Sequence, residues 1–94
     1  MEKGYAPAYN GRGLVYDRLL HHEEAFGDFS QAIKLDPKNA VYWHNRACCL
    51  RNMCRFQDAL YDFDRATNLE INNPIIYSNR GLVNRKLERF EDAI

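Results

Sequence analysis

A spacing of 34 residues recurs along this 94-residue chain, and it limits the folds that the chain can adopt. The residues that repeat at this interval include Arg12, Arg46 and Arg80, then Ala25, Ala59 and Ala93, and the aromatic set Tyr9, Trp43 and Tyr77. A fixed period of this size is typical of proteins built from stacked supersecondary units, in which each unit contacts only its neighbours. We therefore expect a repeat protein.

Within each unit, small and apolar residues recur at helical spacing. In the first unit, one such face of a helical wheel runs from Tyr9 to Leu20, and a second face begins at Ala25. The short segment between these faces can form only a tight turn, so each unit should be a hairpin of two helices. The predicted helices span residues 7–19, 23–35, 40–53, 57–70 and 74–87.

These repeating residues resemble the tetratricopeptide repeat (TPR), whose 34-residue pattern is W-x2-L-G-x2-Y, then A-x3-F, then P. The matching residues are Tyr9, Gly13, Tyr16, Ala25, Phe29 and Pro37 in the first unit and Trp43, Ala47, Leu50, Ala59 and Phe63 in the second. The resemblance implies an all-α fold, a right-handed α-solenoid of antiparallel helix hairpins. We expect one domain over residues 1–94, with repeats at 6–39 and 40–73 and a partial repeat at 74–94.

The chain stops in the middle of its third unit, at the segment EDAI. Solenoids usually close with a capping helix that has a polar outer face. We therefore expect a fragment of a longer array that exposes apolar residues at its C-terminal edge. Those residues are Leu82, Val83, Leu87 and Phe90. Such an edge predicts self-association into a homo-oligomer.

One arginine and one aspartate recur in every complete unit, each among apolar residues on the packed side of its helix. A charge in that position needs a partner, so we expect structural ion pairs. Pairing within a unit would join Arg12 to Asp28 and Arg46 to Asp62, leaving Arg80 alone. Pairing between units would instead join Arg46 to Asp28 and Arg80 to Asp62.

The first helices of successive TPR units line a groove that binds a peptide or a helix of a partner protein, and the resemblance implies such a protein-binding scaffold here. The polar residues expected on this face are Arg18, His44, Asn45, Arg51, Asn52, Asn79, Arg85 and Lys86. Because most of these charges are positive, an acidic peptide is the predicted partner. The alternative is that they are ordinary solvated charges.

Some TPR domains bind the C-terminus of heat-shock chaperones through a clamp of lysine, asparagine and arginine side chains. The residues at the five clamp positions here are Asn10, Leu14, Asn45, Ile75 and Asn79. In these domains the five positions hold lysine and asparagine in the first unit, asparagine in the second, and lysine and arginine in the third. Only Asn45 has the required residue type, so from the sequence we do not expect a partner of this chaperone class.

Catalysis is not expected. His44 and Cys48 are four residues apart on one predicted helix and could touch, but no third group to orient them follows from the sequence. Cys49 has the spacing of a small core residue, and His22 that of a half-buried packing residue. No cysteine or histidine pair has the spacing of a zinc site, so we expect no metal site and no cofactor.

The composition argues against several other partners. The chain has 13 basic and 13 acidic residues and no net charge, which gives it no overall attraction to nucleic acid or to membranes. It also has no apolar segment near the roughly 20 residues needed to cross a bilayer, so a cytoplasmic protein is expected, with the nucleus as the alternative. A helical repeat that binds RNA, and a purely structural self-assembling segment, remain the alternative functions.

Overall fold

The computed structural model describes residues 5–69, and this part of the chain forms four α-helices and no strands. They are α1 (Ala6–Arg18), α2 (His22–Leu35), α3 (Ala40–Asn52) and α4 (Phe56–Leu69). Each begins and ends within one residue of its predicted bounds. The predicted helix at 74–87 lies outside the described residues. None of these four helices is both long and apolar enough to cross a membrane.

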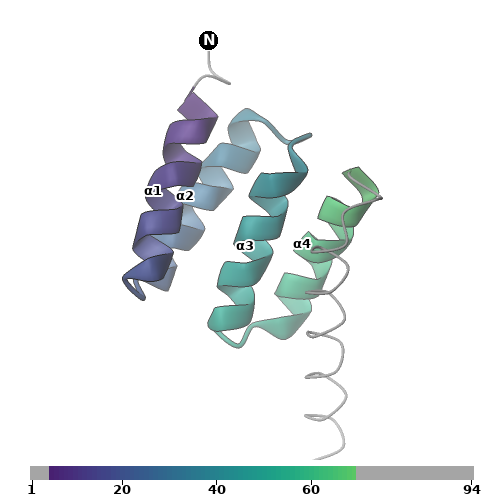
Figure 1. Ribbon diagram of the computed structural model, residues 1–94. Helices are drawn as coiled ribbons and strands as arrows, with labels where there is room; N and C mark the ends of the chain where they lie inside the picture. Colours follow the sequence, from purple (N-terminus) through teal and green to yellow (C-terminus); the bar gives the residue numbers. More distant parts are fainter. Residues whose placement is uncertain (1–4, 70–94) are drawn as a thin grey trace, which may run out of the picture.

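The four helices form two antiparallel hairpins that stack side by side (Figure 1). Helix α1 pairs with α2, α3 pairs with α4, and α2 packs against α3. The first helices of the two hairpins, α1 and α3, run in the same direction in one layer, and α2 and α4 lie behind them (Figure 1). The predicted all-α solenoid is thus confirmed for the described residues.

The two helices of each hairpin are joined by turns of the same backbone geometry. Leu20 and Cys54, which are 34 residues apart, both have a positive φ, of 65° and 61°. In the first turn, the N–H of His21 donates to the carbonyl of Tyr16 at 2.9 Å, and the equivalent bond in the second turn has the same length. This bond is characteristic of a Schellman motif, which closes a helix C-terminus through the backbone. The repeat is therefore present in the hydrogen bonding of the turns as well as in the helices.

The connection between the hairpins is fixed by two bonds. The Asn39 side chain caps α3 by accepting a hydrogen bond from the Val41 N–H at 3.0 Å. The indole Nε1 of Trp43 donates to the Pro37 carbonyl at 2.7 Å, which joins α3 to the loop before it. These bonds orient the second hairpin relative to the first, and they give the predicted packing residue Trp43 a partner for its one polar atom.

The core is centred on α2, α3 and α4. The buried apolar residues are Ala6, Ala25, Phe29, Ala32, Ile33, Ala40, Tyr42, Trp43, Ala47, Cys49, Leu50, Ala59, Phe63 and Ala66. Helix α1 buries only Ala6 and Gly13. A Cβ added at Gly13 would lie 2.7 Å from the Phe29 ring, so glycine is needed there for α1 to approach α2.

Candidate functional site

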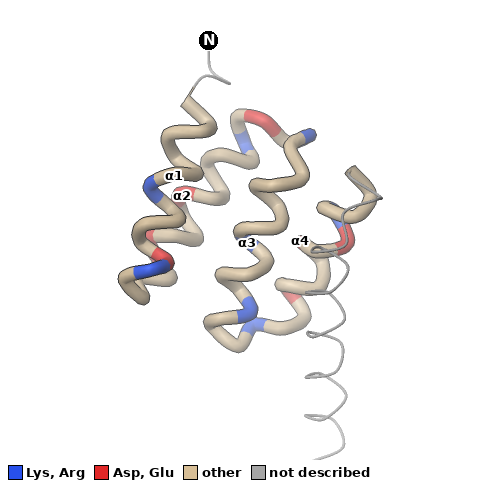
Figure 2. Tube along the Cα trace, viewed as in Figure 1, with Lys and Arg blue, Asp and Glu red and all other residues tan. Residues whose placement is uncertain are grey.

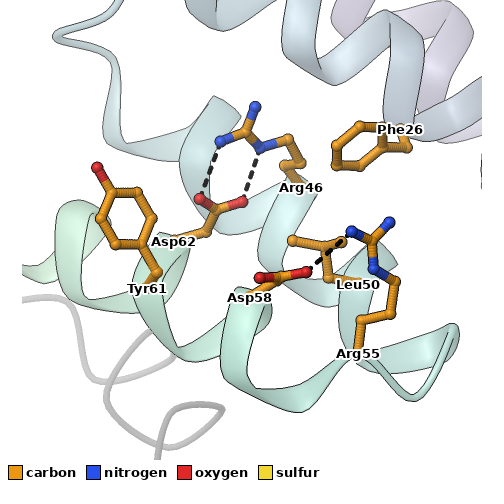
Figure 3. Close-up of a pocket in the computed structure, with 7 residues that line it drawn as sticks. All are labelled: Phe26, Arg46, Leu50, Arg55, Asp58, Tyr61 and Asp62. Atoms are coloured by element: carbon orange, nitrogen blue, oxygen red, sulfur yellow. Dashed lines mark hydrogen bonds and ion pairs between the residues drawn. The ribbon is translucent and has the colours of Figure 1, made fainter.

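Each described unit contains a bidentate ion pair between its two helices. Arg12 donates from Nε and Nη2 to the Asp28 carboxylate at 2.8 and 2.7 Å. Arg46 donates from the same two atoms to Asp62 at 2.7 and 2.9 Å (Figure 3). Of the two pairings left open by the sequence, the structure therefore selects the one within a unit. Arg80 lies outside the described residues.

The two pairs have the same geometry but different surroundings. The Arg46 side chain is 19% exposed, whereas that of Arg12 is 61% exposed. The difference arises because α2 covers Arg46: Ser30 Oγ accepts a bond from Nη1 at 3.1 Å, and the Phe26 ring lies 5.5 Å from the guanidinium carbon. No helix within residues 5–69 covers Arg12 in the same way. Its hydrogen bond to Asp28, and the charge of that carboxylate, raise the pKa of the Arg12 guanidinium.

A shallow cavity of about 220 Å³ opens beside the second pair (Figure 3). Its lining residues are Phe26, Arg46, Leu50, Arg55, Asp58, Tyr61 and Asp62. The charged groups are already matched, because Arg46 bonds to Asp62 and Arg55 bonds to Asp58 at 2.9 Å. The cavity therefore offers a ligand little beyond apolar contact.

The predicted binding face lies on α1 and α3. Asn45 donates from Nδ2 to the Asn10 Oδ1 at 2.8 Å, so two side-chain amides meet where the two units adjoin. Arg18 is in the last turn of α1 and Arg51 is in the last turn of α3. Because these helices run in the same direction, their last turns, and with them the two arginines, lie at the same end of the layer. Figure 2 shows basic positions at this end of the layer.

The remaining predicted residues of this face are divided between α3 and the part of the chain beyond residue 69. Asn52 is exposed, and the half-buried His44 ring lies 5.7 Å from the Phe63 ring on α4. His44 therefore contacts the core as well as the face. Three further residues predicted for this face, Asn79, Arg85 and Lys86, lie outside the described residues, as do the apolar residues of the predicted C-terminal edge.

His44 and Cys48 do approach each other, with 3.7 Å between Nε2 and Sγ. Burial lowers the pKa of His44, and burial raises the pKa of Cys48. Both shifts favour a neutral imidazole beside a protonated thiol. Since the thiolate is the reactive form of cysteine, this environment is the opposite of one that activates a nucleophile.

Two side chains beside the first turn meet a third that is distant in sequence, which the sequence did not predict. His22 Nδ1 is 2.7 Å from Asp17 Oδ1, and Cys49 on α3 donates from Sγ to the His22 carbonyl at 3.2 Å. Burial and the neighbouring Asp17 carboxylate raise the pKa of Cys49 to about 12. Cys49 is fully buried, as its spacing predicted. No local motif signals the cluster, because Cys49 is 27 residues from His22 and reaches it only through the stacking of α3 on α2.

Family comparisons agree with this architecture. Models of the tetratricopeptide repeat match residues 6–39 and 29–61. The chain belongs to the tetratricopeptide repeat family. TPR domains are generally non-catalytic modules for protein interaction. The boundaries expected for the second and third units of this TPR chain remain a prediction.

Solved TPR structures align with nearly the whole chain. The Arabidopsis OM64 TPR domain is 27% identical, with a TM-score of 0.91 over 99% of this chain and 77% of that one. The first TPR of Spaghetti (RPAP3), bound to the HSP90 peptide SRMEEVD, is 26% identical, with a TM-score of 0.89 over 97% of this chain and 72% of that one. The second TPR of Spaghetti, bound to the same peptide, has the same fold at 23% identity, covering 97% and 84% of the two chains with a TM-score of 0.89. No curated protein sequence matches the chain.

The exclusion of the chaperone class of partner was wrong. Similar structures include TPR domains in complex with the HSP90 peptide, which is the class of ligand that the five-position comparison rejected. That comparison assumed that the first unit of this chain corresponds to the first unit of the clamp. Because all units share the same 34-residue pattern, the pattern does not show which unit of this chain corresponds to which unit of the clamp. Two of the five positions, Ile75 and Asn79, also lie outside the described residues.

Proposed function

We propose that this TPR chain is a protein-binding scaffold whose α1 and α3 face holds an extended acidic peptide with a free C-terminal carboxylate. The observation that carries the proposal is the amide pair of Asn10 and Asn45. It joins the two units at the middle of the face, with a 2.8 Å bond between side chains that solvent partly reaches.

Side-chain amides suit an extended peptide because each provides both a donor and an acceptor. When a ligand arrives, the Asn45 amide can turn from Asn10 to a peptide carbonyl or carboxylate. Asn10 Oδ1 then loses its donor, and because its side chain is only half-buried it can accept from a peptide N–H or from water instead.

Charge supports an acidic ligand. Arg18 and Arg51 lie at one end of the face, and arginine can form two parallel hydrogen bonds to a carboxylate. A competing account is that both arginines only offset the partial negative charge at a helix C-terminus, which favours cations there. A binding experiment separates these accounts.

The test is calorimetric titration of the chain with the peptide SRMEEVD, since a domain that is 26% identical to this chain binds it. A second peptide has the same sequence with an amidated C-terminus, and a third has glutamine in place of both glutamates. We expect binding to the first peptide and weaker binding to the other two. Equal affinity for all three, or binding to none, would contradict the proposal.

Two pairs of variants locate the site. Arg18→Gln should weaken binding, whereas Lys34→Gln should not, although each removes an exposed cation from the last turn of a helix. Likewise Asn45→Ala should weaken binding, whereas Asn68→Ala, at an exposed position on α4, should not. A loss that is equal within each pair would show that the peptide binds elsewhere or through net charge alone.

A further inference from the structure

We propose that Asp17, His22 and Cys49 form a binding site for one zinc-class divalent metal ion where the two units meet. One ligand atom from each side chain lies within 4.8 Å of the others. Ligands around a tetrahedral zinc ion lie about 3.5 Å apart, given metal–ligand distances of about 2.0–2.3 Å. Small side-chain rotations would therefore bring the three atoms to coordination distance.

The ligand chemistry selects the kind of metal. A thiol and an imidazole suit zinc and cobalt, whereas magnesium and calcium prefer sites made of oxygen atoms. Three protein ligands leave a fourth tetrahedral position for water or for a group from a partner. The site therefore has the ligand number of an open zinc site.

The surroundings allow an ion to enter while keeping the site partly enclosed. The His22 and Asp17 side chains are 22% and 21% exposed, and Cys49 lies behind them, fully buried. The ion would enter past the carboxylate and the imidazole and reach the thiol last. Because Asp17 and His22 flank the turn of the first hairpin and Cys49 belongs to α3, a bound ion would cross-link the two units.

Binding must displace the interactions that the cluster makes without metal. The bond between His22 Nδ1 and Asp17 Oδ1 opens, and the Cys49 thiol gives up its hydrogen bond to the His22 carbonyl. The thiol loses its proton to solvent as the metal–sulfur bond forms, so one proton is released for each ion bound at Cys49. Because the metal and a proton compete for the same sulfur, metal affinity should fall as the pH is lowered.

The chain provides a matched control beside two of the three ligands. His21 adjoins His22 but lies near Glu24, with 3.2 Å between Nδ1 and Oε2. Cys48 adjoins Cys49 but lies against His44. Neither neighbour belongs to the cluster, so each tests whether the metal recognises this site or binds any nearby histidine or cysteine.

The experiment is titration of the reduced chain with Co²⁺, followed by absorption. We expect one equivalent to bind, with a sulfur-to-cobalt charge-transfer band and d–d bands of tetrahedral intensity, and Zn²⁺ to abolish both. Zn²⁺ should also raise the melting temperature, because an ion that binds only the folded state stabilises it. The bands should persist in His21→Ala and in a Cys48→Ala, Cys54→Ser double variant.

Loss of a ligand should have a large effect. Cys49→Val should abolish the charge-transfer band, because valine is a small apolar residue that can occupy the buried Cys49 position but has no sulfur to bind the metal. His22→Ala should weaken Co²⁺ binding by more than tenfold, since even groups that only orient a ligand contribute about 10–100-fold. Absence of the band in the unaltered chain, or its persistence in Cys49→Val, would overturn the proposal, as would its loss in both control variants.

Discussion

Removing the Arg46 guanidinium should be among the most destabilising single changes in the described part of this TPR chain. Arg46→Ala breaks both bonds to Asp62 and the bond to Ser30, and it leaves a carboxylate whose side chain is only 2% exposed. It also removes the cation that lies 5.2 Å from the Trp43 ring. The dominant cost is the stranded Asp62 charge, because burying a carboxylate without a partner is expensive.

The expected loss in the free energy of unfolding is about 3–5 kcal/mol, the range for breaking a buried ion pair from one side. Two charge-assisted hydrogen bonds of about 1.5–3 kcal/mol each lead to a similar value. In a domain of this size, about 3 kcal/mol corresponds to a fall of at least about 12 °C in melting temperature. Urea unfolding followed by circular dichroism, with a thermal melt beside it, would measure both quantities.

The matched control is Arg12→Ala, which removes the same two bonds from the first unit. Because the Arg12 side chain is 61% exposed and no described helix covers it, water can replace its bonds more easily and the loss should be smaller. The double variant Arg46→Ala/Asp62→Ala should recover part of the stability lost in Arg46→Ala, since no charge is then stranded. A loss below about 1 kcal/mol for Arg46→Ala, or a loss as large for Arg12→Ala, would refute this reasoning.

Three further predictions concern backbone and thiol environments. Gly13→Ala should lower the free energy of unfolding by about 1–3 kcal/mol through overpacking against Phe29. Gly11→Ala should raise it by up to about 1 kcal/mol, because a Cβ added there would have no atom within 4 Å and alanine favours a helix. Chemical unfolding of both variants checks the difference, and equal effects would contradict it. Leu20→Gly should raise the melting temperature, by relieving about 1 kcal/mol of strain at a positive φ; a lower value would show that the 76% exposed side chain contributes more than the strain costs. At pH 8, Cys49 should react with a thiol reagent far more slowly than the exposed Cys54, because Cys49 is buried and its pKa is raised to about 12. Mass spectrometry of the labelled peptides measures both rates, and comparable rates would contradict this prediction.

The sequence predicted the helices well because the repeat supplied each one more than once. Residues with the same role recur 34 positions apart, so that a weak local signal in one unit is supported by the next. The ion pairs followed from the same logic, since a charge on a packed face needs a partner. What the sequence left open was the choice between partners within and between units, because Asp28 and Asp62 repeat with the same period as the arginines. Only the packing of the helices could decide that.

Two parts of the site could not be predicted from spacing. The cluster of Asp17, His22 and Cys49 depends on how closely α3 approaches the first turn, which no local pattern encodes. The ligand class was misjudged for a different reason. A fixed list of five positions tests one register of a repeat, whereas similar folds bind the HSP90 peptide through a surface whose register this sequence alone does not define.

Helices α1 and α3, which carry the arginines of the two ion pairs, are buried to different extents, and this difference should affect how easily each helix opens. Helix α1 buries two of its residues, while α3, which lies between α2 and α4, buries six. Local opening is least costly where few apolar contacts must be broken. The amides of α1 should therefore exchange with solvent faster than those of α3. Within residues 5–69, unfolding should begin at α1, and the region around Trp43 should be among the last parts to open.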